Sequence, residues 1–408
     1  MDYQQALGRL YGLSSRGMRL GLGPVSEAAA RLGNPERALR CVQIAGTNGK
    51  GTVSCLLAHA AREAGLTVGL FTSPHLHRFA ERIRVNGDEA DEATLARHIT
   101  RVFDVMEDAP ALPLTFFEIA TLAALSAFAE AAVDLAVLEV GLGGRLDATT
   151  IAPAEATAIV TIGLDHPDLL GSTVAEVAHE KAGIARPGVP IVVGPLAPQA
   201  LTVVDAHARM VGAPVLAMGR DFFVPEDLTP PWPGRHQREN AAVALKVFAV
   251  LGRADARLAP SVFARALPEA RWPGRYEIVD GRPRHILDGA HNAEGAAALA
   301  QTLVGQGERP DAAVFGAVRG KPVSRMLDIL RPVVGRVVLT RPPLSRALDP
   351  AGLFAPGDEI VATVEGALAR AAALAGPRGT VLVTGSLFTM AEARRLLLGE
   401  RSDPPVGL

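Results

Sequence analysis

Apolar residues fall into two kinds of run along the first two thirds of the chain. Short apolar runs predict buried strands at residues 41–45, 67–71, 134–140, 156–162 and 190–193. Longer segments with helical spacing of apolar residues lie at residues 1–40, 50–64 and 114–132. Strands that alternate with helices predict a mostly parallel sheet covered by helices on both faces.

A second alternating series begins after a change of composition at residues 267–274, where the sequence Leu-Pro-Glu-Ala-Arg-Trp-Pro-Gly is typical of a linker. Strands are predicted at residues 284–287, 312–315, 336–339 and 380–383, and helices at residues 293–303, 324–330, 364–374 and 390–398. We therefore predict two α/β domains. Residues 1–269 would form a P-loop-type domain with a mostly parallel sheet, and residues 270–408 a smaller Rossmann-like domain.

Composition and charge narrow the class of protein. The 408 residues carry a formal net charge of only −2, which gives no electrostatic reason to expect nucleic acid or an anionic membrane as a partner. The longest uncharged run, residues 187–204, contains four prolines and does not predict a transmembrane helix. The first residues resemble no signal peptide, and two cysteines cannot build a disulfide framework. We expect a cytoplasmic monomer.

A glycine-rich loop follows the first predicted strand and precedes a helix. Its residues are Gly46, Thr47, Asn48, Gly49, Lys50, Gly51 and Thr52. Glycines let backbone amides turn toward an anion, and the N-terminus of the helix adds its dipole. In such a loop Lys50 would reach the β- and γ-phosphates and Thr52 would coordinate Mg²⁺. The alternative is a glycine-rich βα turn without a ligand, but strand, lysine, hydroxyl and helix in this order favour binding of ATP or GTP.

Two polar residues near later strand ends are candidate metal ligands. Glu139 ends an apolar strand, and His166 follows the next strand along the chain. Ligands bind at the carboxyl edge of parallel sheets, and Mg²⁺ bound to ATP takes one or two protein carboxylates beside phosphate oxygens. Thr52, Glu139 and His166 therefore form a candidate set. The alternatives are a helix-capping role for Glu139 and a core or turn position for His166.

Lysine is rare in this chain. Lys50, Lys181, Lys246 and Lys321 are its four lysines among 41 lysine and arginine residues. A chain that uses arginine for most cations keeps lysine where a compact amine is needed, because arginine does not lose its proton in proteins. Lys50 and Lys181 are therefore candidate functional lysines; the alternative for Lys181 is a solvated position on a helix.

Several segments together resemble the Mur ligase superfamily, and more narrowly the folylpolyglutamate synthase/dihydrofolate synthase family. In order along the chain they are residues 32–35, 45–52, 72–76, 81–87, 138–149, 165–166, 180–184, 236–241, 272–275, 288–292 and 384–387. The resemblance extends from about residue 20 to residue 398. The segment Leu-Glu-Val-Gly-Leu-Gly-Gly-Arg-Leu-Asp at residues 138–147 is highly specific to this family.

The resemblance implies an ATP-dependent ligase of folate biosynthesis. Its pterin substrate, dihydropteroate or a reduced folate, would attack the γ-phosphorus of ATP through its carboxylate, and the amine of L-glutamate would then attack the acyl phosphate. The resemblance also implies two Mg²⁺ ions, and a CO₂-derived carbamate on Lys181 that helps to hold the second. Such a carbamate requires a neutral amine, hence a lysine with a lowered pKa.

The resemblance assigns further residues to the site. The residues with catalytic roles are Lys50, Lys181, Arg275 and His291. Those that contact nucleotide, besides the glycine-rich loop, are Asn240, Arg275 and Asp288. Those that bind substrate are Ser73, His75, Arg82, Thr115, Phe117, Asp147 and Ser386. For Phe117 the alternative is a position at the start of a core helix, and for the polar residues of the second domain a place in a surface loop.

Two positions depart from the family pattern, and two rival functions explain the sequence less well. Ala293 stands where the family usually has proline, and residues 316–326 keep only Lys321 of an acidic-Lys-acidic stretch. A UDP-muramoyl amino-acid ligase of the same superfamily would need a nucleotide-sugar domain before Gly46, and the preceding residues are too few. A P-loop switch protein that hydrolyses nucleotide would leave the metal ligands and the second domain unexplained.

Overall fold

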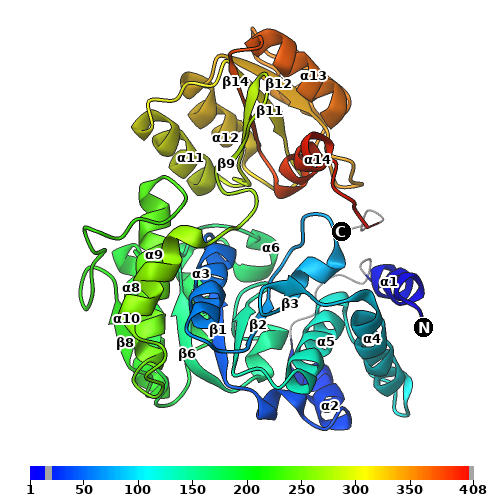
Figure 1. Cartoon of the computed structure of the whole chain (residues 1–408), viewed down its shortest axis with the longest axis vertical. Coiled ribbons are helices and arrows are strands. Elements are labelled where there is room, and N and C mark those ends of the chain that lie inside the picture. Colours follow the sequence, from blue (N-terminus) through cyan, green and yellow to red (C-terminus); the bar gives the residue numbers. More distant parts are fainter. Residues whose placement is uncertain (14–20, 404–408) are drawn as a thin grey trace. The chain divides into compact units, whose positions relative to one another are not determined.

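The computed structural model describes residues 1–13 and 21–403, and the chain divides into two compact units (Figure 1). The first unit comprises residues 1–75, 79–231 and 238–270. Within the described residues, the second comprises 76–78, 232–237 and the chain from residue 271 onward. The main division between the units falls between residues 270 and 271. The short segments 76–78 and 232–237, which belong with the second unit, were not foreseen.

The described part of the first unit contains an eight-stranded sheet with the order β4-β3-β2-β5-β1-β6-β7-β8. Its strands are β1 (Cys41–Ala45), β2 (Val68–Phe71), β3 (Ile83–Val85), β4 (Asp88–Glu89), β5 (Leu135–Glu139), β6 (Ala154–Ile159), β7 (Ile191–Val193) and β8 (Val215–Ala217). Six strands are parallel, while β3 and β4 pair antiparallel at one edge. The five predicted strands are confirmed; β3, β4 and β8 were not predicted.

Helices cover this sheet, as predicted. They are α1 (Tyr3–Gly12), α2 (Gly23–Arg31), α3 (Lys50–Glu63), α4 (Glu92–Glu107), α5 (Phe116–Glu130), α6 (Pro167–Leu170), α7 (Val174–Ala182), α8 (Pro198–Val211), most of α9 (Arg235–Leu251) and α10 (Pro260–Ala266), with the short 3-10 turns η2 (Pro35–Ala38), η3 (Phe79–Arg82), η4 (Ala148–Ile151) and η5 (Leu267–Glu269). Residues 14–20 of the predicted helical region 1–40 lie outside the described residues. Across the described ranges 1–13 and 21–403, no helix is both long and apolar enough to cross a membrane.

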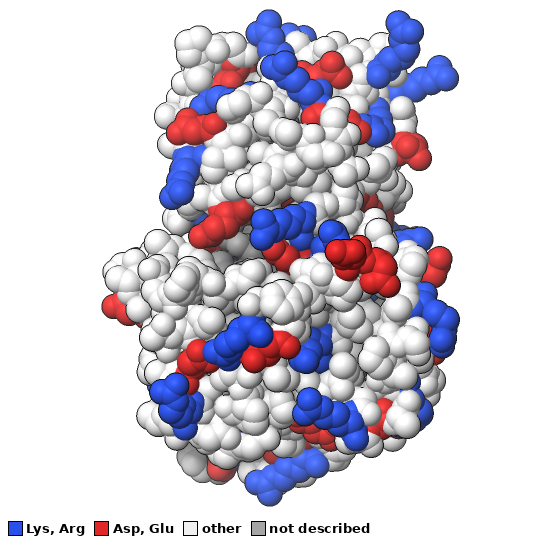
Figure 2. All heavy atoms as spheres, turned by 90° about the vertical axis from the view of Figure 1, so that its left-hand side faces the viewer, with Lys and Arg blue, Asp and Glu red and all other residues white. Residues whose placement is uncertain are grey.

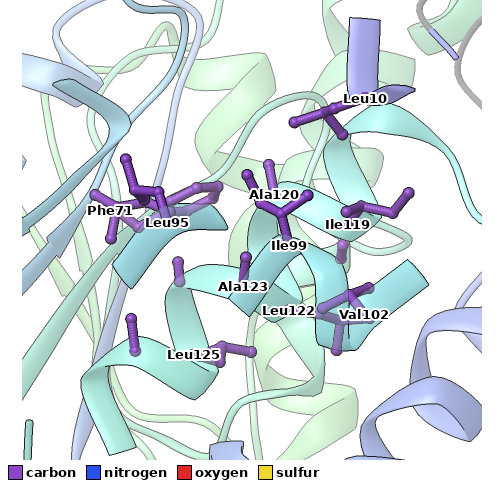
Figure 3. Close-up of a cluster of buried hydrophobic side chains, with 14 of the residues drawn as sticks. Leu10, Phe71, Leu95, Ile99, Val102, Ile119, Ala120, Leu122, Ala123 and Leu125 are labelled. Atoms are coloured by element: carbon purple, nitrogen blue, oxygen red, sulfur yellow. The ribbon is translucent and has the colours of Figure 1, made fainter. Parts of the chain in front are cut away.

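The largest buried cluster of the first unit lies between β2 and the helices α1, α4 and α5 (Figure 3). Leu10 of α1 and Phe71 of β2 contribute to it, together with apolar residues spaced by three or four positions along α4 and α5. The helix α5 is buried over most of its surface, and Thr115 caps its N-terminus in a capping box with Glu118. This packing fixes the residues that precede α5 and follow β2, both of which carry predicted substrate residues.

The second unit contains a six-stranded sheet with the order β13-β12-β11-β14-β10-β9, and β9 is its antiparallel edge strand. The strands are β9 (Glu277–Val279), β10 (Arg284–Leu287), β11 (Ala312–Gly316), β12 (Arg336–Thr340), β13 (Glu359–Ile360) and β14 (Thr380–Thr384). The helices are α11 (Ala293–Gly305), α12 (Val323–Leu330), α13 (Val364–Ala375) and α14 (Leu387–Leu398), with the 3-10 turns η6 (Arg331–Val333) and η7 (Pro350–Leu353). All four predicted strands and all four predicted helices are confirmed, while the edge strands β9 and β13 were not predicted.

Charges of both signs are interspersed on the face of the molecule in Figure 2. Many arginines pair with acidic residues, as Arg220 does with Asp205 at 2.8 Å and Arg370 with Glu359 at 2.6 Å. Arginine therefore serves as the surface cation in this chain, which agrees with the scarcity of lysine. Exposed pairs of this kind contribute little to stability, about 0–1 kcal/mol each.

Candidate active site

The glycine-rich loop is fastened to the segment that follows β6. The backbone amide of Thr47 donates to the carbonyl oxygen of Thr161 at 2.9 Å, and its hydroxyl donates to the carbonyl oxygen of Gly163 at 3.0 Å. The amide of Asn48 donates to the Thr161 hydroxyl at 2.8 Å. The loop directly follows the carboxyl end of β1, which lies between β5 and β6 in the sheet. It therefore sits at the carboxyl edge, where parallel sheets bind ligands.

Gly49 is the N-cap of α3 and has a φ of 84°, a conformation that favours glycine. A Cβ atom at this position would lie 2.5 Å from Oδ1 of Asn240 and 2.8 Å from Cγ1 of Val160. Only glycine therefore fits. The same contact places Asn240, the residue that the family resemblance assigns to the nucleotide, directly beside the loop.

Two lysine amines converge on one backbone oxygen of the loop. The Nζ atoms of Lys50 and Lys181 donate to the carbonyl oxygen of Gly46 at 3.1 and 3.0 Å. Lys181 lies in the last turn of α7, and only 3% of its surface is exposed. Burial, together with the nearby charge of Lys50, lowers the pKa of Lys181 to about 7, against smaller opposing effects of Asp165 and Asp147. A substantial fraction of this amine is therefore neutral at physiological pH.

The predicted metal ligands differ in their surroundings. Thr52 is buried in the first turn of α3, and its hydroxyl has no hydrogen-bond partner among the residues that the structure describes. Glu139 is buried at the end of β5, where its Oε2 accepts a hydrogen bond from the amide of Ser73 at 3.1 Å. His166 has a φ of 51° and precedes α6, with its Nε2 atom 3.9 Å from Asp165 Oδ2.

This donor set fits a nucleotide-bound magnesium ion. The Thr52 hydroxyl is open to a ligand, because no described residue accepts from it or donates to it. Within the described part of the chain, no three His, Cys, Asp or Glu side chains gather into a metal site by themselves. A hard cation held by a hydroxyl, one carboxylate and phosphate oxygens does not require such a cluster. The residues present therefore fit Mg²⁺ that arrives with the nucleotide.

The segment after β2 carries three predicted substrate residues, and two of them contact each other. Nε of Arg82 lies 2.8 Å from Nδ1 of His75, and its guanidinium lies 5.1 Å from the centre of the Phe116 ring. Arg82 is buried, and this burial lowers its pKa to about 10. A buried cation on this segment, within the electrostatic influence of Glu139, suits a negatively charged substrate group.

Asp147 uses its carboxylate to shape the loop that follows β5. Its Oδ2 accepts hydrogen bonds from the amides of Gly141 and Leu142 at 2.9 and 3.0 Å. Its Oδ1 accepts from the amide and hydroxyl of Thr149 at 3.0 and 2.6 Å. Burial raises the pKa of Asp147, against these hydrogen bonds. Four donors occupy both oxygens, so the carboxylate acts first on the loop; the predicted contact with a pterin would have to replace one of them.

Thr115 and Phe117 lie at the start of α5, where the Phe117 ring approaches the same loop. The Thr115 hydroxyl donates to Glu118 at 2.7 Å as part of the capping box. The Phe117 ring lies so close to Gly141 that a Cβ atom there would be 2.6 Å from Cζ of the ring. Phe117 is half-buried, so one part of the ring remains accessible for stacking.

A polar residue inside β1, not among the predicted site residues, supports this loop. Gln43 is buried, and its Nε2 donates to the hydroxyls of Thr149 at 2.9 Å and Thr150 at 2.7 Å. Thr149 in turn donates to Asp147. A signal was present, because Gln43 is the one polar residue in the apolar run at 41–45.

In the second unit the predicted residues follow neighbouring strands. Asp288 comes directly after β10 and Ser386 soon after β14, and these strands pair in parallel. Asp288 accepts hydrogen bonds from the amides of Tyr276 at 3.0 Å and Ala290 at 2.9 Å; burial raises its pKa, against the charge of Arg275. Ser386 caps α14 by accepting from the amide of Thr389 at 3.0 Å.

The remaining predicted residues of this unit lie beside Asp288. Arg275 donates to the carbonyl oxygen of Gly274 at 3.1 Å, and Nδ1 of His291 lies 2.9 Å from the carbonyl oxygen of Gly289. The departure at Ala293 leaves the start of α11 intact, because Asn292 accepts a hydrogen bond from the amide of Gly295 at 2.8 Å and caps the helix without proline.

One protein-family model and many proteins of known name match this chain. The model described as Mur ligase, glutamate ligase domain, matches residues 274–387. The dihydrofolate synthase/folylpolyglutamate synthase of Bacillus subtilis is 33% identical over 97% of this chain and 99% of its own length. A probable bifunctional folylpolyglutamate synthase/dihydropteroate synthase of Haloferax volcanii is 36% identical over 97% of this chain, but the chain spans only 50% of that relative.

Solved structures resemble the whole chain. E. coli FolC in complex with DHPP and ADP matches with a TM-score of 0.90 and 31% identity, covering 98% of both chains. Folylpolyglutamate synthase of Mycobacterium tuberculosis, complexed with ADP and AMPPCP, matches with a TM-score of 0.89 and 30% identity, covering 98% of this chain and all of that one. The similarity thus includes both units and relatives that bind adenine nucleotides.

Proposed function

Because the chain belongs to the dihydrofolate synthase/folylpolyglutamate synthase family of ATP-dependent amide-bond-forming ligases, we propose that it joins L-glutamate to dihydropteroate and to reduced folates. One observation carries the proposal: two lysine amines meet on the carbonyl of Gly46, beside the buried hydroxyl of Thr52. In this arrangement Lys50 supplies a cation, and the Thr52 hydroxyl an open ligand position, for phosphoryl transfer from ATP. The protein thereby acts in folate metabolism.

The phosphoryl-transfer step is assigned to the glycine-rich loop. The carboxylate of the pterin substrate attacks the γ-phosphorus, the bond to ADP breaks, and an acyl phosphate forms. Backbone amides at the start of α3 hold the phosphates, and Lys50 exchanges the carbonyl of Gly46 for a phosphate oxygen. Since this reaction depends mainly on positioning and electrostatics, the charge of Lys50 is its principal contribution from this chain.

Magnesium would be held by Thr52, Glu139 and His166. When bound, it neutralises charge on the phosphates, so that two anionic substrates can approach each other. We further propose that Lys181 takes up CO₂ as a carbamate and contributes to a second cation site. The amine loses a proton in this reaction and becomes an anion; its lowered pKa and its burial support that chemistry, because a neutral amine is the species that reacts.

The glutamate step is assigned to the second unit. The amine of L-glutamate attacks the acyl carbon, and phosphate leaves from the tetrahedral intermediate. Arg275 is proposed to meet the phosphates, Asp288 the nucleotide, and His291 and Ser386 the incoming amino acid. Asp288 and Ser386 follow two neighbouring parallel strands, which supports a shared site at that edge.

The pterin is assigned to the segments around Arg82 and Phe117. Arg82 and His75 would meet its anionic end, and Phe117 would stack on a ring. Asp147 and Thr115 form the rigid wall of the site through the hydrogen bonds described, in addition to any direct contact. That the protein acts as a monomer in the cytoplasm stays a prediction.

One experiment tests the proposal. Purified protein receives MgATP, L-glutamate and either dihydropteroate or tetrahydrofolate, and ADP release and product mass are followed. We expect ADP release only with a pterin, and a product heavier by one glutamyl residue. ADP release without any pterin would instead indicate a nucleotide-hydrolysing switch, and activity only with a UDP-muramoyl substrate would indicate the cell-wall branch of the superfamily.

A further inference from the structure

A buried glutamine of β1 donates hydrogen bonds to two threonine hydroxyls of the loop that follows β5. Nε2 of Gln43 lies 2.9 Å from Oγ1 of Thr149 and 2.7 Å from Oγ1 of Thr150. The Thr149 hydroxyl donates its single proton to Oδ1 of Asp147 at 2.6 Å. The Thr150 hydroxyl donates its proton to the carbonyl oxygen of Gly144 at 2.7 Å. Both hydroxyls therefore need a donor as their other partner, and the amide nitrogen of Gln43 supplies both hydrogens.

The residues of this arrangement are shielded from water. Gln43, Thr149, Thr150 and Asp147 are each no more than 8% exposed. A buried polar group that loses its partner destabilises the fold, because water does not reach it to take the partner's place. A glutamine inside an apolar strand is itself unfavourable unless its amide is paired. The two hydrogen bonds of Gln43 thus offset its burial and fix two neighbouring residues of the loop at once.

The first of the two hydrogen bonds leads to the carboxylate of Asp147. Thr149 provides two of the four hydrogen bonds that this carboxylate accepts, one from its hydroxyl and one from its backbone amide at 3.0 Å. The other two come from the amides of Gly141 and Leu142. Asp147 belongs to the wall of the site that we assign to the pterin. Gln43 therefore acts on this wall from within the sheet, through one intervening hydroxyl.

The second hydrogen bond leads, through Thr150, to the part of the loop that contacts the last turn of α7. A Cβ atom on Gly144 would lie 3.0 Å from the carbonyl oxygen of Lys181, so the loop and this turn are in close contact. The backbone amide of the next residue, Arg145, donates to the carbonyl oxygen of Glu180 at 2.9 Å. The amine of Lys181 in turn donates to the carbonyl oxygen directly after β1. The contacts thus return to the strand from which they start.

We propose that Gln43 is a positioning residue of the ligase. Through Thr149 it orders the carboxylate of Asp147. Through Thr150 it holds the loop against the turn of α7 that carries Lys181. The inference rests on the proposed function, because it concerns the order of that site. A site held in its binding conformation loses less entropy when substrate binds, whereas a catalytic group that shifts by a fraction of its contact distance lowers the rate.

The test separates the two hydrogen bonds with two variants of unchanged shape. We expect Thr149→Val to raise the KM for dihydropteroate about tenfold, with kcat changed less than about twofold. Thr150→Val should lower kcat about tenfold and leave this KM within about twofold. Gln43→Met should show both effects, and the KM for ATP should stay within about twofold in all three. Calorimetric titration of dihydropteroate without glutamate should show weaker binding for Thr149→Val and unchanged binding for Thr150→Val.

The matched control is Thr157→Val. Thr157 of β6 pairs with Gln43 in the sheet and is equally buried, but its hydroxyl has no hydrogen-bond partner among the described residues. This variant should match wild type in all constants.

A double substitution tests whether Gln43 acts through Thr150. The variant that combines Gln43→Met with Thr150→Val should keep the kcat of Gln43→Met, because the same path is lost in both. Factors that multiply, or Gln43→Met constants equal to those of Thr157→Val, would overturn the inference while the proposed function stands. Should Gln43→Met fail to fold, as judged by urea unfolding, equal effects of the two threonine variants on KM and kcat would overturn it. A wild-type protein that ligates glutamate to neither pterin would overturn both.

Discussion

Replacing Lys181 by methionine should separate the stability of the fold from its activity. Lys181 is almost fully buried, and its amine donates to Gly46. Burial and the charge of Lys50 lower the pKa of Lys181 from 10.5 to about 7. Between these two pH values the unfolded chain binds a proton that the folded chain has released. The free energy of unfolding of the wild type therefore rises with pH across this window.

The magnitude follows from the same shift. A pKa lowered from 10.5 to about 7 corresponds to roughly 4 to 5 kcal/mol by which the charged amine opposes folding at neutral pH. Methionine has a similar volume and no charge, but it cannot make the hydrogen bond to Gly46, and this loss lowers the free energy of unfolding by about 1 kcal/mol. We expect Lys181→Met to be about 3 kcal/mol more stable than wild type at pH 7. The wild type should gain about 2 kcal/mol from pH 7 to pH 9, and the variant should not.

Urea unfolding at pH 7 and pH 9 measures both quantities, in nucleotide-free buffer depleted of CO₂. Lys246→Met is a matched control, because Lys246 is a half-buried lysine of α9 whose amine lies 5.6 Å from the centre of the Phe222 ring. A Lys181→Met protein less stable than wild type at pH 7, or one that keeps the gain toward pH 9, would refute the reasoning. In glutamate ligation we expect both Lys181→Met and Lys181→Arg to lose at least about 100-fold in kcat. Near-normal activity of Lys181→Arg would exclude the carbamate.

Three further predictions address other parts of the first unit. Gly49→Ala should lower the free energy of unfolding by about 2–4 kcal/mol, because its Cβ would meet Oδ1 of Asn240 at a positive φ; an unchanged urea midpoint would contradict this. Asp147→Asn should lower the free energy of unfolding by about 2 kcal/mol and reduce kcat, because an amide nitrogen cannot accept hydrogen bonds from the loop. A variant as stable as wild type would show that these bonds do not shape the loop. Burial raises the pKa of Cys41 to about 12, and Cys55 is also buried. Iodoacetamide at pH 8 should therefore label both cysteines only after denaturation. Rapid labelling of the native protein, detected by mass spectrometry, would contradict this prediction.

The parts of the fold that the sequence predicted are those with a local cause. The strand β1, the glycine-rich loop and α3 follow one another directly, so periodicity and glycine placement define them together. The edge strands were missed because they are short. The hairpin of β3 and β4 nevertheless had a signal, since Asn86 and Gly87 have φ values of 53° and 90° and form the asparagine-glycine pair typical of a tight turn.

The sequence of helix α4 also carries a recognisable helix signal, although this helix was not predicted. Asp91 caps it by accepting from the amide of Thr94, and apolar residues such as Leu95 and Ile99 recur at helical spacing. It could have been predicted by the same rules that found α5. What no local rule could supply is its packing against α5, which fixes the two segments that hold Thr115 and Arg82.

The candidate site shows where local reasoning ends. Lys181 and Gly46 are 135 residues apart, and their contact depends on where the folded chain places α7. The rarity of lysine indicated that Lys181 was special, but not that its amine would share an oxygen with Lys50. The same applies to Asp147: the motif identified the residue, whereas the four donors that occupy its carboxylate come from the three-dimensional course of the loop.

The cost of burying Lys181 and its proposed chemistry have one physical origin. A dry environment beside the charge of Lys50 disfavours the ammonium form, and this destabilises the fold at neutral pH. The same environment leaves a neutral amine that can react with CO₂, whereas an arginine would stay protonated there and remain an unpaired buried charge. A chain that uses arginine for nearly every other cation therefore has a chemical reason to keep a lysine at this position, even at the expense of stability.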